Sequence, residues 1–279
     1  MKKFIAITLG ALFLLPAVSC RREDISIEEA RDAKKQEVRF TASVAGYEVK
    51  AYDFSFVTGD AIGIFAFDQV NVKANVSGAT VTPVTPIKWE LVRKADFVAY
   101  YPYDPSFKLD DKVSFTVKTD QRGADAFRNS DLKLAVAEGT NGETVALPFR
   151  HLLAKLDIVV RSADSSEKAT AITFGPVATT VSANLATETI DAPSGSASVQ
   201  AFKDGDAFSA ILVPQTLSSL PLTITTSRGR TVSLPVNTQV QLLTNKITTI
   251  TVDLTTGPEA TFSVSITDWA DGGSMNFHK

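Results

Sequence analysis

Few side chains of this 279-residue chain have the reactivity that catalysis needs. It has two histidines, His151 and His278, and one cysteine, Cys20. It contains no Gly-x-Ser-x-Gly nucleophile elbow, no His-Glu-x-x-His zinc motif and no glycine-rich phosphate loop. His151 lies beside apolar residues, which favours a structural histidine over a general base. We therefore expect no enzymatic activity, no catalytic residue and no cofactor.

Two acidic segments, Asp110-Asp111 and Asp204-Gly-Asp206, are the candidates for a calcium loop. Calcium takes about 6–8 oxygen ligands, and these segments offer too few of them in sequence. They are interpreted as turns, and no metal site is predicted. No acidic residue stands out in a setting that would raise its pKa, as the acid of a glycoside hydrolase requires.

The one cysteine stands where a lipid anchor would be attached. Met1-Lys2-Lys3 is positively charged, 4–15 is an apolar run of signal-peptide length, and Leu15-Pro16-Ala17-Val18-Ser19-Cys20 follows. Small residues before a cysteine at this distance resemble the lipobox of bacterial lipoproteins, in which the thiol receives a diacylglycerol and becomes the mature N-terminus. The alternative is an ordinary signal peptide with an incidental cysteine. We expect a signal peptide over residues 1–19 and a lipidated, charged tether over residues 20–36.

Composition indicates a folded protein: 44% of the residues are hydrophobic and 21% are charged. The length exceeds an ordinary domain of roughly 100–200 residues, so two domains are expected. A net charge of −3 provides no basic field, and nucleic acid is not an expected partner.

Apolar and polar residues alternate through much of the chain, and helical periodicity is nearly absent. Val38–Val44 alternates as a half-buried strand does, while 62–67 and 96–103 are interpreted as further strands. Residues 70–86 are rich in Val and Thr and contain two prolines, which predicts edge strands and a loop. These patterns favour an all-β fold.

Residues 149–160 are interpreted as the seam between two β-domains. The segment opens like a short helix or turn and continues as a strand through Leu156, Ile158 and Val160. Short strands with Gly, Pro and Asp turns follow, including a hairpin around 227–230. The prediction is two tandem β-sandwich domains, residues 37–148 and residues 149–279.

Three tyrosines gather at the end of one predicted strand: Tyr100, Tyr101 and Tyr103. Amphipathic rings suit a carbohydrate platform. The alternative is that alternate residues belong to the core and the others line the strand end.

Many segments resemble, in order, those of the fimbrillin-like lipoproteins, which are type V pilins and pilus-associated subunits. The residues that carry the resemblance are the leader ending at Cys20, Phe40-Thr-Ala-Ser, Gly59-Asp-Ala-Ile-Gly-Ile-Phe65, Ile87-Lys-Trp89, Asp96-Phe-Val-Ala-Tyr-Tyr-Pro-Tyr103, Asp120-Gln121, Ser130-Asp-Leu132, Phe149-Arg-His-Leu-Leu-Ala-Lys-Leu156 and Ile266-Thr-Asp-Trp269.

This resemblance implies β-sandwich domains of transthyretin-like topology, export as an outer-membrane lipoprotein, and polymerisation by strand exchange. In that family a protease cuts after an arginine behind the first strand, and the C-terminal strand of another subunit fills the groove. Phe262, Val264 and Ile266 alternate near the end of this chain and are the expected donor residues. The alternative is that they form the last strand of their own domain.

The expected processing position departs from the family pattern, because Lys50-Ala51 stands where the resemblance implies an arginine before an alanine. Because an arginine-specific protease should not cut at this lysine, we expect that a protease with a different specificity cuts the chain, or that the chain stays uncut and serves as an anchor or a terminal subunit. The predicted function is a fimbrial subunit, accessory or anchor in adhesion, with other pilin subunits, the outer membrane and a surface glycan or protein as partners. A monomeric glycan-binding surface lipoprotein is the alternative.

Overall fold

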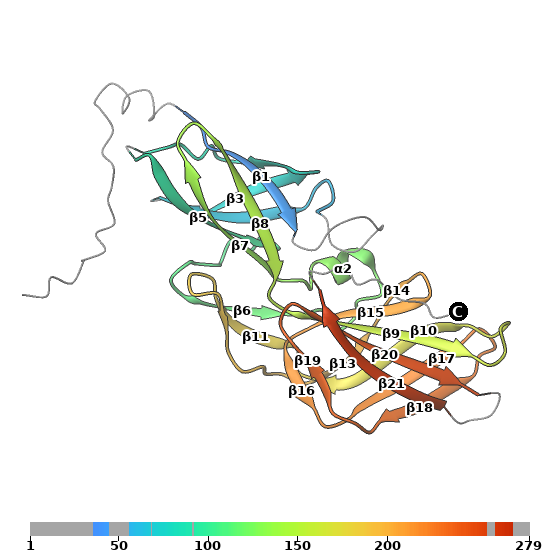
Figure 1. Ribbon diagram of the computed structural model, residues 1–279. Helices are drawn as coiled ribbons and strands as arrows, with labels where there is room; N and C mark the ends of the chain where they lie inside the picture. The colour runs from blue at the N-terminus through green and yellow to red at the C-terminus, as the bar shows by residue number, and fades with distance from the viewer. Residues whose placement is uncertain (1–35, 45–55, 68, 91, 256–259, 270–279) are drawn as a thin grey trace, which may run out of the picture.

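The computed structural model describes residues 36–44, 56–67, 69–90, 92–255 and 260–269, and these residues are almost entirely β-structure (Figure 1). The only helix among them is the short α2 (Ala124–Arg128). The all-β prediction is confirmed. The described residues contain no helix that is long and apolar enough to cross a membrane.

The first group of strands has seven members and closes into a barrel in the order β1-β4-β3-β2-β5-β7-β8. Its strands are β1 (Arg39–Val44), β2 (Ala61–Ala66), β3 (Gln69–Ser77), β4 (Thr80–Pro83), β5 (Lys94–Tyr101), β7 (Lys133–Thr140) and β8 (Thr144–His151). The barrel closes because β1 runs antiparallel to β4 on one side and parallel to β8 on the other. The prediction that 70–86 holds edge strands is therefore wrong, since β3 and β4 each have a neighbour on both sides.

The second group of strands forms two facing sheets. One has the order β14-β15-β9-β20-β21 and the other the order β13-β10-β17-β18. The strands of the first sheet are β14 (Phe202–Asp204), β15 (Ala207–Leu212), β9 (Ala154–Ser162), β20 (Lys246–Leu254) and β21 (Ala260–Asp268). Those of the second are β13 (Ala197–Gln200), β10 (Ala169–Val177), β17 (Leu220–Thr226) and β18 (Thr231–Val236). Apolar residues of both sheets form one core, and β17 and β18 form the hairpin that the sequence predicted.

Two smaller sheets complete the fold. β6 (Lys112–Thr116), β11 (Thr180–Asn184) and β12 (Thr189–Ile190) form one, while β16 (Gln215–Leu217) and β19 (Val240–Leu242) form the other. β6 pairs with β11 over five residues, so a strand from the first half of the sequence joins the second half (Figure 1). The boundary between residues 148 and 149 remains a prediction; β8 runs through it.

The segment expected to open as a short helix or turn, around Phe149, is instead the end of β8, and the bend comes at Leu152 and Leu153. Both leucines are buried in a third core, which also contains Phe65, Ile211 and Trp269. Because this core draws on strands from both ends of the sequence, it holds the barrel and the paired sheets together.

Gly63 in β2 shows how tightly this third core packs. A Cβ atom on Gly63 would lie 2.2 Å from Cε1 of Tyr100 and 2.6 Å from Oδ1 of Asn71. The Tyr100 ring cannot easily move, since it is fully buried and its hydroxyl lies 2.6 Å from both Asn71 Oδ1 and the Asp104 carbonyl oxygen.

We expect Gly63→Ala to lower the free energy of unfolding by about 1–3 kcal/mol, the usual penalty of overpacking. Gly123→Ala is the matched control, since an added Cβ there meets nothing within 4 Å. Urea denaturation measures both variants. Equal, small effects would contradict the packing described for Gly63.

Candidate functional site

The first candidate site is the slot that β1 occupies. Val38, Phe40, Ala42 and Val44 point into the barrel and are 3–8% exposed. Phe40 packs edge-on against Phe97, with ring centroids 5.3 Å apart. Each edge of β1 is paired, with Thr80-Val81 of β4 and with all six residues 144–149 of β8. Removing β1 would therefore expose an apolar slot between two unpaired strand edges, and such edges readily accept another strand.

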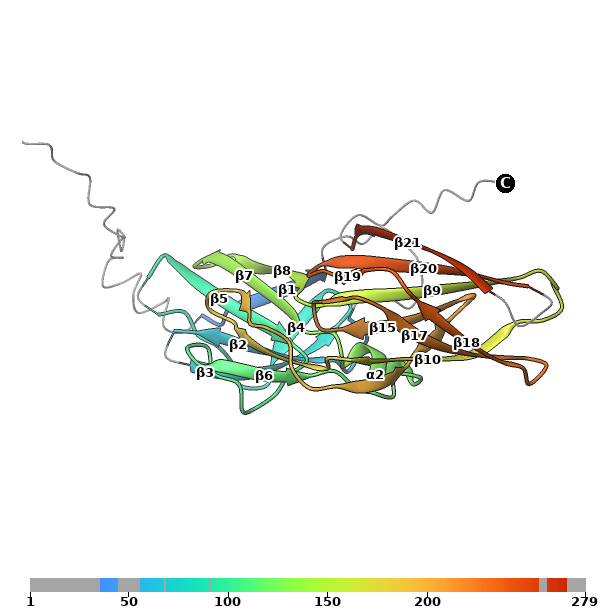
Figure 2. The same ribbon diagram turned by 90° about the horizontal axis from the view of Figure 1, so that it is seen from below.

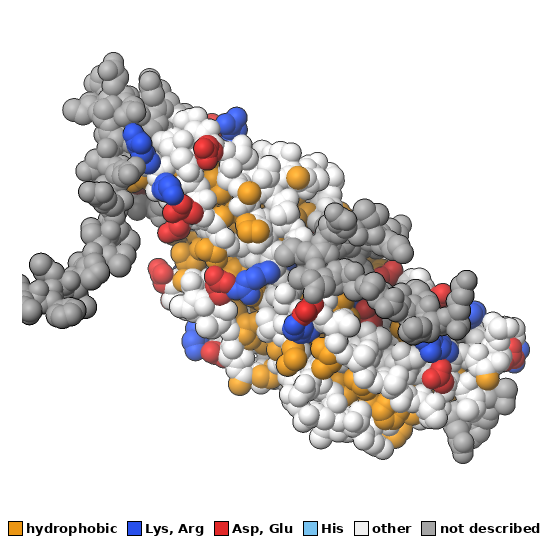
Figure 3. All heavy atoms as spheres, viewed as in Figure 1, with side chains coloured by type: hydrophobic (Ala, Val, Ile, Leu, Met, Phe, Trp, Pro, Cys, Tyr) orange, Lys and Arg blue, Asp and Glu red, His pale blue; other side chains and the backbone are white. Residues whose placement is uncertain are grey.

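The second candidate site is β21, which carries the three predicted donor residues. It pairs with β20 along its full length of nine residues and lies at the outer edge of its sheet (Figure 2). Phe262 and Val264 are partly buried against the core of the paired sheets, whereas Ile266 is 40% exposed. In Figure 3 hydrophobic side chains show on the surface along the part of the molecule where Figure 1 draws β21. In this structure β21 is thus the last strand of its own sheet, and all three residues lie on one face of it.

The far end of β21 leads into a buried cluster of charged groups. Trp269 is 4% exposed and stacks on His151, with ring centroids 3.7 Å apart and planes inclined by 5°. Nδ1 of His151 lies 2.9 Å from Oδ2 of Asp131, and the Lys133 Nζ atom lies 2.7 Å from the same oxygen. Asp131 precedes β7, Lys133 is its first residue, His151 is the last residue of β8, and Trp269 directly follows β21. We call these four side chains the junction cluster.

The junction cluster continues into the barrel. Lys133 Nζ lies 4.6 Å from the centroid of the Tyr101 ring, a cation–π contact that is strongest where water is excluded. The Tyr101 hydroxyl lies 3.3 Å from Oδ1 of Asp60 and 3.2 Å from Oδ1 of Asn129. A chain of ring-stacking, ionic, cation–π and hydrogen-bonding contacts therefore links the end of β21 to the turn before β2.

Charges in the junction cluster shift two pKa values. Burial lowers the pKa of His151 below its usual value, Lys133 and Lys155 act in the same direction, and Asp131 opposes them. Burial would raise the pKa of Asp131, but the positive charge of Lys133 and the hydrogen bonds from His151 and Lys133 outweigh it and lower this pKa to about 2. His151 is consequently neutral and Asp131 ionised at neutral pH.

We expect the free energy of unfolding to fall as the pH drops below about 6.5, the pKa of an unperturbed histidine. In that range the unfolded chain binds a proton at His151 and the folded chain does not, so acid favours unfolding. The loss is about 1.4 kcal/mol for each unit by which the folded pKa is depressed. Urea titrations at pH 7 and pH 5 measure it, and the variant His151→Gln should show a smaller difference. An unchanged difference would contradict the role of His151.

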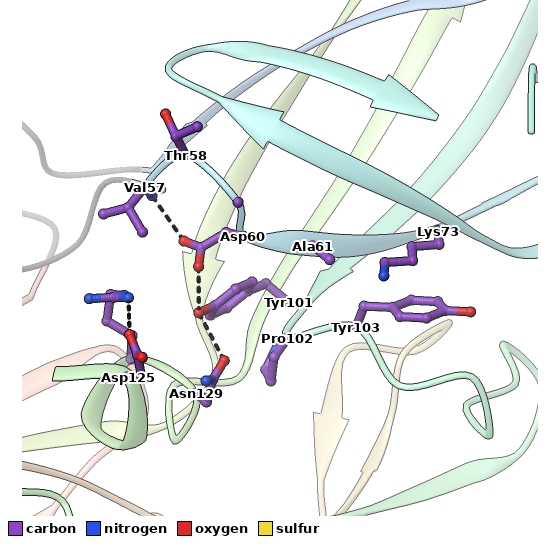
Figure 4. A pocket seen from close by; sticks show the side chains of 12 residues that line it. Val57, Thr58, Asp60, Ala61, Lys73, Tyr101, Pro102, Tyr103, Asp125 and Asn129 are labelled. Carbon is purple, nitrogen blue, oxygen red and sulfur yellow. Dashed lines mark hydrogen bonds and ion pairs between the residues drawn. The ribbon is translucent and has the colours of Figure 1, made fainter. Parts of the chain in front are cut away.

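A polar cleft of about 440 Å³ opens beside this chain of contacts (Figure 4). Its walls come from the turn Thr58–Asp60, the end of β5, Lys73 of β3, and α2 with Asn129. Val57 donates its backbone N–H to the Asp60 carboxylate at 2.9 Å, and Asp125 pairs with Arg128. A second cleft of about 330 Å³ adjoins it along Pro102, Tyr103 and Asn129.

The predicted tyrosine platform does not form as a unit. Tyr100 and Tyr101 are at most 2% exposed, and burial is the main reason that the pKa of Tyr100 rises to about 12 and that of Tyr101 rises further. Tyr103 alone is half-buried, at the cleft, with Lys73 Nζ 5.7 Å from its ring centroid. Two of the three rings therefore belong to the core.

Three predicted site residues, Cys20, Lys50 and Ala51, lie outside the described residues, and their roles stay predictions. Within the described ranges no group of three or more His, Cys, Asp or Glu side chains is arranged to hold a metal ion. Sequence reasoning missed the junction cluster. Its segments Ser130–Leu132, Phe149–Leu156 and Ile266–Trp269 appeared in the family resemblance, but nothing in them indicates that Asp131 and Trp269 meet at His151.

Comparison with known proteins assigns the family. The model of the fimbrillin-like family matches residues 50–269, which is well over half of the chain. The chain belongs to the fimbrillin-like family. Membership makes it a fimbrial, adhesion-related protein of the cell surface. A search of curated proteins found no match.

Several solved structures share the fold of this chain. The chain is similar to a putative cell adhesion protein from Bacteroides uniformis, with 22% identity, coverage of 84% of this chain and 99% of that one, and a TM-score of 0.66. A putative cell adhesion protein from Bacteroides ovatus gives 18% identity, 84% and 98% coverage, and a TM-score of 0.66. A fimbrial protein from Bacteroides vulgatus gives 15% identity, 83% and 99% coverage, and a TM-score of 0.52.

Proposed function

We propose that this fimbrillin-like protein is a subunit of a surface fimbria that assembles by strand exchange. Proteolysis behind β1 removes that strand, and the C-terminal strand of another subunit takes its place. The observation that carries the proposal is the position of β1: its inward side chains are 3–8% exposed, and it is hydrogen-bonded along both edges. A barrel that loses this strand needs a replacement, because bare edges and an apolar slot are unfavourable in water.

We further propose that Cys20 carries a lipid that anchors the unprocessed chain in the outer membrane, and that Lys50-Ala51 is the processing position. Each buried CH₂ of an acyl chain adds about 0.8 kcal/mol, so a lipoprotein with two or three chains is held stably. An uncut chain keeps both β1 and its lipid and acts as the anchor of a fibre. A cut chain loses both and enters the fibre. The protein performs no catalysis in either role.

Limited trypsin treatment of the detergent-purified full chain tests this function. Trypsin cuts after lysine, and cleavage at Lys50 should yield ladders of oligomers on unheated gels. The variant Lys50→Gln should give none under the same conditions. A chain that is cut at Lys50 and stays monomeric, yet shifts on a polysaccharide gel, would overturn the proposal in favour of a monomeric glycan binder. Such a binder would have to use Tyr103 and the cleft, since Tyr100 and Tyr101 are buried.

A further inference from the structure

The two clefts at the end of the barrel share a common wall, formed by Pro102, Tyr103 and Asn129. Their volumes of about 440 Å³ and 330 Å³ lie within the range of ligand-binding pockets, roughly 300–1,000 Å³. All residues that line them lie between positions 57 and 129. Cleavage after Lys50 removes none of these residues, so the uncut and the cut chain both contain the walls of the clefts.

Tyr103 is a fixed aromatic side chain between the two clefts. Its ring is half-buried against the third core, and its backbone N–H donates to the carbonyl oxygen of Ala61 at 3.0 Å. Figure 4 shows the ring beside Lys73, whose Nζ atom lies 5.7 Å from the ring centroid. An amphipathic ring that is already held in place can pack on the C–H face of a sugar with little loss of side-chain entropy.

The acidic side chains of the clefts are engaged within the protein. In the first cleft, the Asp60 carboxylate accepts a backbone N–H at 2.9 Å, and Asp125 pairs with Arg128. In the second cleft, the carboxylate of Asp104 accepts the backbone N–H and the hydroxyl of Ser106 at 2.8 Å and 2.6 Å. These carboxylates are therefore not available to balance further positive charge.

Two exposed lysines line the clefts, Lys73 in the first and Lys118 in the second. Within the part of the chain that the structure describes, neither lysine forms an ion pair, and Nδ2 of Asn129 on the shared wall has no hydrogen-bond acceptor. The groups that remain free to bind a ligand are thus donors and positive charges. They match a molecule with carboxylates and many oxygen acceptors.

We propose that the clefts bind an acidic oligosaccharide, with one sugar ring packed on Tyr103 and sugar carboxylates paired with Lys73 and Lys118. Polar walls of this kind suit a hydroxyl-rich ligand better than an apolar one. The inference goes beyond the proposed function, because strand exchange joins subunits whereas the clefts recognise a surface glycan. Neither β1 nor β21 contributes a residue to the clefts, so a subunit in a fibre keeps this site.

Surface plasmon resonance with the detergent-purified full chain tests the proposal. The immobilised probes are three acidic glycans, polygalacturonate, hyaluronate and polysialate, together with dextran as a neutral glycan and polyglutamate as an acidic peptide. The chain should bind at least one acidic glycan more tightly than it binds dextran or polyglutamate. Lys73→Gln should weaken that binding about tenfold, because it removes a hydrogen bond between charged groups.

Two matched pairs of variants locate the site. Lys88→Gln is the control for Lys73→Gln, since Lys88 is an exposed lysine between β4 and β5 that lines neither cleft. Tyr103→Ala should also weaken binding about tenfold, whereas Tyr103→Phe keeps the ring and should retain most of the affinity. Thermal unfolding shows whether each variant remains folded.

The outcomes separate this inference from the proposed function. Binding to an acidic glycan that falls with Lys73→Gln and Tyr103→Ala, but not with Lys88→Gln, would support the site. Binding to none of the three acidic glycans, or equal binding to dextran, would overturn it. Equal binding to polyglutamate would overturn it in favour of an acidic peptide. The cleaved Lys73→Gln chain should form normal ladders, so a loss of glycan binding leaves strand exchange standing.

Discussion

Phe262→Ala should abolish ladder formation by the cleaved chain while leaving the uncut protein folded. Phe262 is the largest apolar side chain on the inward face of β21, and in the proposed fibre it enters the slot that β1 leaves, where Phe40 is 3% exposed in the uncut chain. Truncating a fully buried phenylalanine costs about 3–5 kcal/mol, and this loss would recur at every contact between subunits. In the uncut chain Phe262 is only partly buried at a sheet edge, so the loss of folding stability should be smaller.

Ser263→Ala is the matched control for this prediction, because Ser263 is the exposed neighbour of Phe262 on the same strand. Its ladders should equal those of the unaltered chain. Thermal unfolding of the uncut variants shows whether each remains folded. Normal ladders from a folded Phe262→Ala protein would contradict the role of β21 as the inserted strand.

Asp131→Ala should have the largest effect on folding stability, lowering the free energy of unfolding by about 3–5 kcal/mol, since it leaves a buried cation without its partner. Asp131 and Lys133 are 2% and 4% exposed, with 2.7 Å between the carboxylate and the ammonium group. The Asp131 carboxylate also lies within hydrogen-bonding distance of His151, and the Trp269 ring stacks on the His151 ring. Urea denaturation at pH 7 measures the change.

An exposed ion pair supplies the control for Asp131. The carboxylate of Asp125 is paired with Arg128 but its side chain is 85% exposed, so Asp125→Ala should change the stability by no more than about 1 kcal/mol. The double variant Asp131→Leu/Lys133→Met should recover part of the loss, because apolar pairs often replace buried ion pairs without penalty. A loss below about 1 kcal/mol for Asp131→Ala would show that the junction cluster is not a buried, coupled unit.

The strands that cover one face of the core were predictable from the sequence. β1 alternates between buried and more exposed side chains, and a period of two in the sequence follows directly from that alternation. The hairpin of β17 and β18 was predictable because its turn lies between two alternating segments. These features depend on local geometry alone.

The sequence did not predict which strands pair with one another when they are far apart along the chain. Residues 70–86 were expected at an edge on account of their prolines, yet Pro83 is the last residue of β4 and still faces Ala74 in the ladder of a closed barrel. The pairing of β6 with β11 joins residues about seventy positions apart, and no period in either strand specifies its partner. Sheet closure is a property of the whole barrel rather than of any one segment.

The candidate site was predictable only in part. The alternation of Phe262, Val264 and Ile266 marked β21 as a strand, but the sequence left open whether it belongs to its own sheet. Asp131 and Lys133 are charged and would ordinarily be assigned to the surface; their burial depends on contacts with His151 and Tyr101 that the fold creates. Buried ion pairs of this kind cannot be inferred from residue type.

The N-terminal sequence of the protein recovered from cell-surface fibres tests the proposed function most directly. The account predicts a start at Ala51, because removal of the segment that contains β1 opens the slot for the next subunit. A chain that is present in the body of the fibre with a blocked, lipidated Cys20 and an intact β1 would contradict assembly by strand exchange.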